Sequence, residues 1–493
     1  MALPLAAWIE RRPYAAFAAF AVVHAAVWTA LPTLLYKNLP LDLIEALTYG
    51  REWQLGYDKL PPMPWWLVEI VYRLFGHDVA YYALSGIVII VTFALVFATA
   101  RPLVGAVGAL VGVLIIDGLH YFNYTAPKFN HDVIQLPFWA LAGFAFRAGL
   151  RRGRVADWLL LGFALGMALW AKYFVVILAA PLALFLLIDR EARRALATPG
   201  PWLAVAVALV VMAPHLVWLV RNDFLPFAYA SARAVPSHGA LDHVRHPLVF
   251  AAAQLAALLP ALAIACPLRW PRPAPAAVKV DDFDRRIVTL LAFGPAATLI
   301  ALSAVSGRGL VAMWGYPFWL FLGLWIVMTV RGTIDRARLA RIAAVWAIVF
   351  VGLAAAFVAD YAVLPSIDHR YRAAFFPGDR LADEIDRRFR AATDAPLRYV
   401  IATMWAGGNI AHYSADRPRV LIDGDPRRAP WIDLADLKAR GAAVVWVVSD
   451  PNSLPPEYRA IAPGAQIGAP FTLPARNGIG KVEVGWAILP PGK

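Results

Sequence analysis

The chain has 493 residues, of which 61% are hydrophobic and only 16% are charged, and its mean hydropathy is +0.60. Soluble proteins are apolar over about half of their residues, so this composition excludes a soluble protein and indicates an integral membrane protein. The formal net charge is +13. Because the basic residues gather in loops between apolar segments, membrane topology explains this charge better than nucleic-acid binding does.

Apolar segments recur along the chain at the length that crosses a bilayer, which takes about 20 residues as a helix. They predict about eleven spanning helices, with residues 158–188 supplying two short ones. The first segment has no Ala-x-Ala-like cleavage site, so we expect it to be retained. The predicted spans cover residues 14–35, 80–100, 103–119, 133–146, 158–188, 202–220, 247–267, 287–304, 313–330 and 342–361.

The loops between these segments carry arginine on one side of the membrane if the spans simply alternate. By the positive-inside rule that side is cytoplasmic. This predicts a membrane protein with a cytoplasmic amino terminus and an exported carboxyl terminus. Cys266 is the single cysteine, so no intramolecular disulfide can form. The basic residues are Arg11, Arg12, Arg147, Arg151, Arg152, Arg154, Arg190, Arg193, Arg194, Arg269, Arg272, Arg331, Arg336, Arg338 and Arg341.

After Asp360 the composition becomes mixed, and helix-like and strand-like segments alternate. Leu381, Ile385 and Phe389 recur at helical spacing. The alternation predicts a small α/β domain with a mostly parallel sheet. We therefore expect a transmembrane domain over residues 1–361, with an outer loop at 36–79, and an exported α/β domain over residues 362–493. The predicted elements are helices at 377–389, 405–413 and 434–440 and strands at 399–402, 419–422, 443–448 and 482–489.

The outer loop after the first span places carboxylates beside the membrane. Asp42 and Glu45 are three residues apart among apolar positions, which predicts an interfacial helix with both carboxylates on its polar face. A second interfacial helix follows Pro61-Pro62, and its Trp65-Trp66 pair is expected to face lipid as ordinary headgroup anchors. Anchoring does not explain Asp42, because an acid gains nothing from anionic lipid and costs up to about 2.5–3.5 kcal/mol deep in a membrane.

Short motifs occur in a fixed order along the membrane part. They are Asp42-x-x-Glu45 after the first span, Gly56-Tyr57 and Lys59 before Pro61-Pro62, Asn130-His131-Asp132, Gly162-x-x-x-Gly166 with Lys172, Pro214-His215 with Trp218, and Ser306-Gly307-Arg308 before Trp314 to Pro317. In this order they resemble the GT-C membrane glycosyltransferases. The nearest branch is the dolichyl-phosphate-mannose protein mannosyltransferase superfamily, including the bacterial transferases of aminoarabinose and galacturonic acid to lipid A and core.

The resemblance implies an inverting transferase that moves a sugar from a polyprenyl-phosphate donor to a lipid, glycan or protein acceptor at the periplasmic face. A phosphate leaving group is already anionic near neutral pH, since its second pKa is about 6. A base and some cations therefore suffice, without a general acid. Asp42 matches the position of the family's catalytic base, and Glu45 and Asp132 are the further candidate catalytic carboxylates.

Cations are needed at the donor phosphate, and several of the chain's few lysines are predicted on the outer face, against the positive-inside trend. Lys59 and Arg308 are the first candidates, followed by Arg221 and Lys172. The resemblance requires no cofactor. It leaves a divalent metal open, because Leu60 follows Lys59 where the family usually carries His or Glu nearby. The predicted substrate-lining residues are Tyr57, Asp58, His131, His215, Trp314 and Tyr316.

These residues also have plainer explanations. Lysine and arginine side chains snorkel to lipid headgroups, and a buried histidine such as His215 is often a hydrogen-bonded structural residue. For the whole chain, the expected partners are a polyprenyl-phosphate-linked sugar, a lipid or glycan acceptor and membrane lipids, and no nucleic acid. The alternative functions are a transporter or flippase of an anionic lipid-linked substrate, and a non-catalytic scaffold for the α/β domain.

Overall fold

The chain folds into two compact units, which are described separately. The computed structural model describes residues 2–269, 280–330, 333–447 and 450–492. The helical unit comprises Met1–Leu31, Lys59–Met63 and Tyr82–Ala356, and the α/β unit comprises Pro32–Asp58, Pro64–Tyr81 and Phe357–Lys493. Sequence alone groups the outer loop with the membrane helices, whereas these compact units group most of that loop with the C-terminal residues.

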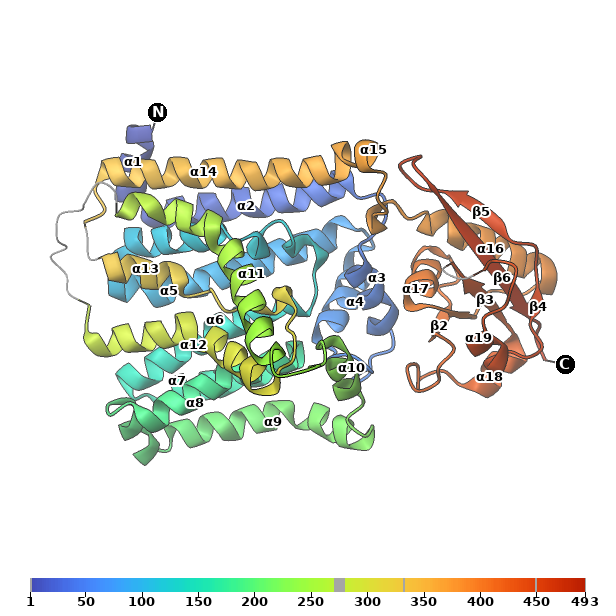
Figure 1. Ribbon diagram of the computed structural model, residues 1–493, viewed down its shortest axis with the longest axis horizontal. Helices are drawn as coiled ribbons and strands as arrows, with labels where there is room; N and C mark the ends of the chain where they lie inside the picture. The colour runs from blue at the N-terminus through green and yellow to red at the C-terminus, as the bar shows by residue number, and fades with distance from the viewer. Residues whose placement is uncertain (1, 270–279, 331–332, 448–449, 493) are drawn as a thin grey trace. The chain divides into compact units, whose positions relative to one another are not determined.

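The helical unit consists of long apolar helices, many of which run side by side (Figure 1). Within the described residues, seven helices are long and apolar enough to cross a membrane, and α7 and the segment ending with α8 are shorter apolar helices. This confirms a multi-pass membrane protein, while the number of crossings stays a prediction. The helices are α1 (Ala2–Arg11), α2 (Pro13–Leu35), α5 (Val79–Asp117), α6 (His131–Arg152), α7 (Val155–Ala171), α8 (Val176–Ile188), α9 (Gly200–Arg221), α10 (Leu225–Arg233), α11 (Asp242–Ala265), α12 (Asp282–Ser306), α13 (Leu322–Val330) and α14 (Arg336–Val358).

The long helix α5 is interrupted where the sequence predicts a boundary between two spans. Gly105 has φ 72° and ψ 173°, a backbone conformation that only glycine adopts readily. Pro102 precedes it and lacks a backbone N–H for the helical ladder. The two halves of α5 therefore correspond to the predicted spans 80–100 and 103–119.

Glycines let neighbouring helices of this unit approach closely. A Cβ atom on Gly162 would lie 2.3 Å from the carbonyl oxygen of Ala204, and one on Gly166 would lie 2.7 Å from Cβ of Val211. The Gly162-x-x-x-Gly166 motif thus packs α7 against α9, as small residues do between membrane helices. Its role is in packing, and it fixes the position of Lys172, which directly follows α7.

One predicted span is wrong in its extent. Of residues 313–330, only Leu322–Val330 forms an α-helix, and it is preceded by the 3-10 turn Ala312–Gly315. Pro317 disfavours a continuous helix, because it has no backbone N–H to donate. Gly315 packs closely on Gln254, where a Cβ would lie 2.0 Å from the Oε1 atom. In the resulting irregular segment, Trp314 packs against Phe174 and Tyr316 packs against Tyr121.

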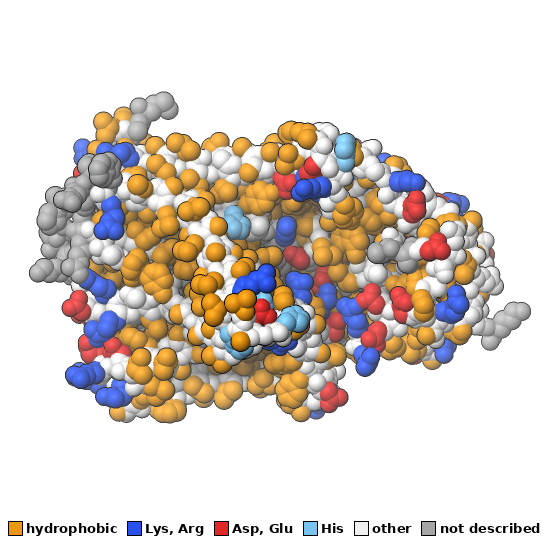
Figure 2. Space-filling view, viewed as in Figure 1, with side chains coloured by type: hydrophobic (Ala, Val, Ile, Leu, Met, Phe, Trp, Pro, Cys, Tyr) orange, Lys and Arg blue, Asp and Glu red, His pale blue; other side chains and the backbone are white. Residues whose placement is uncertain are grey.

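Ion pairs join the arginine-rich loops at one end of the helical unit. Arg336 pairs with Glu10 at 2.5 Å, Arg286 with Asp189 at 2.8 Å, and Arg151 with Asp281 at 3.2 Å. Figure 2 shows charged side chains gathered at this end, whereas hydrophobic side chains cover most of the rest of the unit's visible face. Pairs of predicted cytoplasmic loops therefore meet, as alternating spans require. Arg272 and Arg331 lie outside the described residues.

The α/β unit has a mixed sheet with strand order β2-β1-β3-β6-β4, and β5 pairs with β6. The strands are β1 (Tyr399–Ala402), β2 (Arg419–Ile422), β3 (Ala442–Trp446), β4 (Gln466–Ile467), β5 (Phe471–Pro474) and β6 (Lys481–Leu489). β1 is parallel to β2 and β3, but β6 is antiparallel to β3, β4 and β5. The prediction of a mostly parallel sheet was wrong here, because β5 and β6 form a hairpin, which requires antiparallel strands. Of the predicted strand 443–448, Val448 lies outside the described residues.

Helices cover this sheet and give the unit two apolar cores. Leu381, Ile385 and Phe389 are fully or almost fully buried on one face of α16, as their spacing predicts. The helices are α3 (Leu41–Gly50), α4 (Met63–Phe75), α15 (Pro365–Asp368), α16 (Gly378–Thr393), α17 (Met404–Tyr413), α18 (Leu434–Arg440) and α19 (Pro456–Ile461), with a π-helical turn at Ala359–Val363 and a 3-10 turn at Ala373–Phe375.

The two helices of the outer loop pack into the α/β unit. A Cβ on Gly408 of α17 would lie 2.6 Å from Ile44 and Thr48 of α3, so α3 rests directly on α17. The expectation that Trp65 of α4 faces lipid was wrong. Trp65 is 2% exposed and stacks on Tyr49 with ring centroids 4.4 Å apart, so protein covers this ring, whereas Leu74 of the same helix is 69% exposed.

Candidate active site

A buried ion pair lies at the centre of the candidate residues in the helical unit. Nζ of Lys172 lies 2.5 Å from Oδ1 of Asp132, and Nε2 of Gln135 donates to the same oxygen at 3.0 Å. Asp132 is in the first turn of α6, whose N-cap Asn130 accepts hydrogen bonds from the backbone of Asp132 and Val133. The helix dipole and Lys172 both favour a negative charge on Asp132.

His131 connects this pair to the segment that carries Lys59. Nε2 of His131 donates to the carbonyl oxygen of Pro61 at 3.0 Å. Both residues are buried. Proline has a backbone carbonyl acceptor but no backbone N–H donor. The predicted motif at residues 130–132 and the Pro61-Pro62 motif therefore lie side by side within the helical unit.

Aromatic rings line the neighbourhood of Lys172. Its ammonium lies 5.4 Å from the ring centroid of Phe174, and the ring of Trp314 lies 5.6 Å from that of Phe174. Tyr316 is 1% exposed, hydrogen bonds to Thr125 and packs on Tyr121 with centroids 4.6 Å apart. Trp314 thus lies near the ion pair, while Tyr316 is buried against the loop that follows α5.

Helix α10 contacts several of the predicted residues. The ammonium of Lys59 lies 5.6 Å from the ring centroid of Tyr229, and Nη2 of Arg308 donates to the backbone oxygen and the hydroxyl of Ser231, both at 3.2 Å. Tyr229 and Ser231 are two residues apart on α10. The sequence analysis did not predict this short helix, which contacts both first-choice cations.

His215 lies beside α10 through a second contact. It is fully buried and forms a 2.8 Å hydrogen bond with the hydroxyl of Tyr173. The Tyr173 ring packs on Phe227 of α10 at 5.5 Å, and Trp218 stacks on His215 with an interplanar angle of 11°. These contacts favour the structural explanation of His215.

Two histidines hold the turn that presents Arg308. Nδ1 of His243 donates to the carbonyl oxygen of Ala304 at 2.7 Å, and Nδ1 of His246 donates to that of Gly307 at 2.8 Å. Gly307 has φ 66°, and a Cβ there would lie 2.6 Å from Oγ of Ser237. This turn therefore requires glycine. The sequence offered the Ser-Gly-Arg motif but no sign of the histidine partners.

Arg221 does not join this cluster. It is exposed at the end of α9, and within the described ranges no hydrogen bond or ion pair connects it to Asp132, Lys59 or Arg308. Its predicted role in phosphate binding stays a prediction.

The α/β unit holds the other candidate carboxylates. Asp58 accepts a hydrogen bond from the hydroxyl of Tyr49 at 2.8 Å and pairs with Nε of Arg428 at 2.8 Å. Burial, followed by the negative charges of Asp58 and Glu45, raises the pKa of Tyr49 well above its usual value. Tyr49 therefore remains a protonated donor to Asp58. Arg428 is a partner that sequence reasoning missed, because it lies 370 residues away along the chain.

Asp42 and Glu45 occupy one helix, as predicted. Both lie on α3 and are half-buried, whereas the intervening Leu43 and Ile44 are fully buried. Tyr57 is 1% exposed, and its hydroxyl donates to the backbone oxygen of Tyr49 at 2.7 Å. Tyr57 thus stabilises the turn after α3. It was predicted to line the substrate site, but its hydroxyl already binds the protein backbone.

The predicted residues therefore fall into two groups. Asp132, Lys172, His131, Lys59, Arg308, His215, Trp314 and Tyr316 belong to the helical unit, and Asp42, Glu45, Tyr57 and Asp58 belong to the α/β unit. Among the described residues, no group of three or more His, Cys, Asp or Glu side chains has a geometry suited to a metal ion.

Comparisons with known proteins agree with this picture. Residues 59–218 match the family described as dolichyl-phosphate-mannose-protein mannosyltransferase. The lipid A galacturonosyltransferase RgtD of Rhizobium johnstonii is 29% identical over 57% of this chain and 58% of its own length. The lipopolysaccharide core galacturonosyltransferase RgtA of the same species is 28% identical over 44% of this chain and 42% of its own length. A second core galacturonosyltransferase, RgtB, is 26% identical over 72% of this chain and 74% of its own length. The chain thus spans little more than half of RgtD and less than half of RgtA.

Solved structures show the same fold. ArnT from Cupriavidus metallidurans bound to undecaprenyl phosphate superimposes with a TM-score of 0.63 at 15% identity, covering 96% of this chain and 97% of ArnT. The apo state of ArnT gives a TM-score of 0.61 at 16% identity with the same coverage. The fold is that of the GT-C membrane glycosyltransferases. Over residues 59–218 the chain also resembles the protein mannosyltransferases, in line with its motifs.

Proposed function

We propose that this protein is an inverting glycosyltransferase that moves one sugar from a polyprenyl-phosphate donor to a lipid, glycan or protein acceptor. The observation that carries the proposal is that the curated relatives RgtD, RgtA and RgtB are all galacturonosyltransferases named for lipid A or the lipopolysaccharide core. The fold of ArnT, solved with undecaprenyl phosphate, supports the same donor class.

The relatives also narrow the substrates within this proposal. A uronic acid is the proposed donor sugar, and lipid A or the lipopolysaccharide core is the proposed acceptor. The proposed location is the bacterial inner membrane, with a cytoplasmic amino terminus and a periplasmic α/β domain. The arginine-rich loops that meet at one end of the helical unit support this orientation through the positive-inside rule.

In the proposed reaction, Asp42 accepts the proton of the acceptor hydroxyl. The freed oxygen attacks the anomeric carbon from the side opposite the phosphate, and the bond between that carbon and the phosphate oxygen breaks. The bonding electrons leave with the polyprenyl phosphate, which is a stable anion near neutral pH. The configuration of the anomeric carbon is inverted, and Glu45 is proposed to assist Asp42 from the same helix.

The proposed cations for the departing phosphate are Lys59 and Arg308, with Arg221 behind them. Both first choices contact α10, through Tyr229 and Ser231, which supports a shared task. Arginine binds phosphate through its planar fork, whereas lysine acts as a point charge. Lys172 is proposed to act mainly through Asp132, because its ammonium is 2.5 Å from that carboxylate. The paired Asp132 is then suited to bind a hydroxyl of the sugar or of the acceptor.

Mass spectrometry of lipid A and core from a strain that lacks the gene tests this proposal. The expected result is a glycolipid lighter by one hexuronate and an accumulated polyprenyl-phosphate sugar. Restoring the gene is expected to restore the glycolipid. An unchanged lipid and glycan profile with altered export of a solute would instead support the transporter, which the named relatives do not favour.

A further inference from the structure

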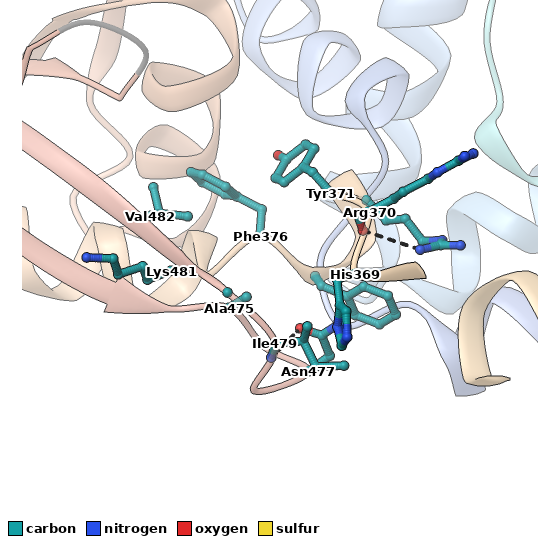
Figure 3. A pocket seen from close by; sticks show the side chains of 12 residues that line it. His369, Arg370, Tyr371, Phe376, Ala475, Asn477, Ile479, Lys481 and Val482 are labelled. Carbon is teal, nitrogen blue, oxygen red and sulfur yellow. Dashed lines mark hydrogen bonds between the residues drawn. The ribbon is translucent and has the colours of Figure 1, made fainter. Parts of the chain in front are cut away.

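The α/β unit contains a cavity of about 140 Å³ that none of the candidate transferase residues lines. Its walls come from the segment that follows α14 and from the β5–β6 hairpin (Figure 3). A backbone hydrogen bond from Arg476 to the carbonyl oxygen of Phe375, 2.8 Å long, joins these two walls. Cavities for whole drug-sized ligands measure about 300–1,000 Å³, so this one has room for a single ring or headgroup.

The inner lining combines aromatic surface with polar groups that form hydrogen bonds. Figure 3 shows Phe376 and Val482 on one side, Tyr371 above, and His369 and Asn477 below the open space. Phe376 is 2% exposed and fixed in the core, whereas Tyr371 is 68% exposed. Aromatic rings with polar groups at their edges suit a ligand that has one apolar face and a rim of hydroxyls, which describes a pyranose ring.

Basic side chains flank this space, and the acids that pair with two of them lie outside its lining. Among the described residues that line the cavity, His369, Arg370, Arg372 and Lys481 are basic and none is Asp or Glu. Arg370 and Lys481 extend outward on opposite sides of the open space (Figure 3). Arg372 is held by Asp360 at 3.1 Å and Asp368 at 2.9 Å. Lys481 pairs with Glu483, but both side chains are more than half exposed, and such surface pairs are weak. Arg370 forms no ion pair in the described part of the chain.

His369, one of the residues that line the cavity, has an unusual backbone conformation. His369 ends α15 with φ 50° and ψ 21°, a left-handed conformation that is unusual for a residue with a side chain. The cavity also follows a candidate membrane span, Arg336–Val363, by only a few residues. Exposed apolar side chains occupy the interval, including Leu364 at 39% and Ile367 at 66% exposure.

We propose that this cavity binds one sugar ring that carries a carboxylate or a phosphate. The ring would lie against Tyr371 and Phe376, with hydroxyls toward His369 and Asn477 and the anionic group toward Arg370 or Lys481. Such a ring has two sources, the headgroup of a membrane glycolipid and a free anionic glycan. This site is distinct in its residues from the proposed transferase site, and its existence does not depend on that activity.

Saturation-transfer NMR of the full-length protein in nanodiscs of neutral phospholipid tests the proposal, with D-galacturonate as the probe and D-galactose as the neutral comparison. We expect binding of galacturonate that is stronger than that of galactose. We expect Arg370→Ala and Tyr371→Ala each to weaken binding about tenfold, the loss of one charge-assisted or ring contact. Arg459→Ala, which removes another exposed arginine of the same unit, is expected to leave binding unchanged.

Two further arms separate the possible outcomes. Lys59→Ala and Asp42→Asn are expected to retain the signal, because those residues do not line the cavity; its loss in these variants with retention in Arg370→Ala would overturn the proposal. Equal binding of galactose, or no binding at all, would also overturn it. Nanodiscs that contain a phosphorylated glycolipid separate the sources, since competition with galacturonate supports the headgroup and its absence supports a free glycan.

Discussion

Asp132 in the helical unit and Asp58 in the α/β unit each contact a cation that is distant in the sequence, but water reaches the two pairs differently. The Lys172 and Asp132 side chains are 10% and 11% exposed, whereas those of Arg428 and Asp58 are 26% and 9% exposed. Asp58 also accepts a hydrogen bond from Tyr49. As water is excluded, the attraction between two charges strengthens and the cost of leaving one of them unpaired grows. Removing one partner should therefore cost more stability in the Lys172–Asp132 pair.

The predicted phosphate ligands also differ in whether a carboxylate already pairs with them. Lys172 was predicted as a phosphate ligand, yet its ammonium already balances Asp132. Arg308 differs, because its described hydrogen bonds go to the neutral oxygens of Ser231. In the described part of the chain no carboxylate pairs with Arg308. Its charge thus remains available for an anionic substrate, which is the property that a donor-phosphate ligand needs.

The largest stability effect is expected at the Lys172–Asp132 pair. Lys172→Met should lower the free energy of unfolding by about 3–5 kcal/mol, because it leaves a buried carboxylate without its cation. Asp132→Asn should cost a similar amount. The double variant should recover much of the loss, since neither charge then remains. Thermal unfolding in detergent measures all three. If the single and double variants were equally unstable, the pair would contribute no specific coupling.

A buried neutral histidine in the α/β unit should make stability depend on pH. Burial, followed by the positive charge of Arg417, lowers the pKa of His412 to about 4. In the unfolded chain the histidine binds a proton near pH 6.5. The contribution of neutral His412 to the free energy of unfolding is therefore complete above pH 6.5 and is lost as the pH falls toward 4. The loss amounts to up to about 3 kcal/mol. Burial raises the pKa of nearby Asp78, which acts in the opposite direction.

Comparison with His412→Gln isolates the histidine, because Asp78 is present in both proteins. Unfolding measured from pH 7 to pH 4 should decline more steeply in the original chain than in the variant. Parallel profiles would show that His412 is not buried in its neutral form.

Arg308 should affect use of the donor more than stability. Arg308→Ala is expected to raise the KM for the polyprenyl-phosphate sugar by about 10–100-fold, the loss of a charge-assisted hydrogen bond of about 1.5–3 kcal/mol. Arg308→Lys should restore part of it, because the charge remains but the fork does not. Initial rates at varied donor concentration measure the effect, with Arg459→Ala as the control. A KM that stays unchanged in Arg308→Ala would exclude the proposed phosphate contact.

The smallest effect is expected at the pair in the α/β unit. Arg428→Met should lower the free energy of unfolding by about 1–2 kcal/mol, because Asp58 keeps its hydrogen bond from Tyr49 and the Arg428 side chain that is lost is 26% exposed. Thermal unfolding beside Lys172→Met gives a direct comparison. A loss as large as that of Lys172→Met would contradict the difference between the two units.

Local features of the fold were predictable from the sequence. The alternation of apolar segments and arginine-rich loops predicted the membrane helices, and the spacing of Leu381, Ile385 and Phe389 predicted the buried face of α16. Glu69 and Arg73, four residues apart on α4, form an ion pair at 2.9 Å, as helical spacing favours. Each of these depends on residues within one or two helical turns, where spacing alone determines which side chains meet.

Features that depend on distant residues were not predictable. Trp65 looked like a lipid anchor, and nothing in its neighbourhood indicated that Tyr49 would cover it. The contact of Arg428 with Asp58 and the histidines that hold the Arg308 turn likewise join separate parts of the chain. In the candidate site, residue types and their order indicated the chemistry. The pairing of each carboxylate with its cation could be identified only from the tertiary structure.

The central claim is tested most directly by sugar transfer with the purified protein. The assay supplies a polyprenyl-phosphate uronic acid and lipid A, and mass spectrometry follows the product. The original chain should form a glycolipid heavier by one hexuronate, and Asp42→Asn should lower the rate about 10²–10⁴-fold with an unchanged melting temperature. Glu457→Gln, at an exposed acid of the same unit, should retain full activity. A fully active Asp42→Asn protein would contradict the assignment of the base, and no transfer by the original chain would contradict the proposed reaction.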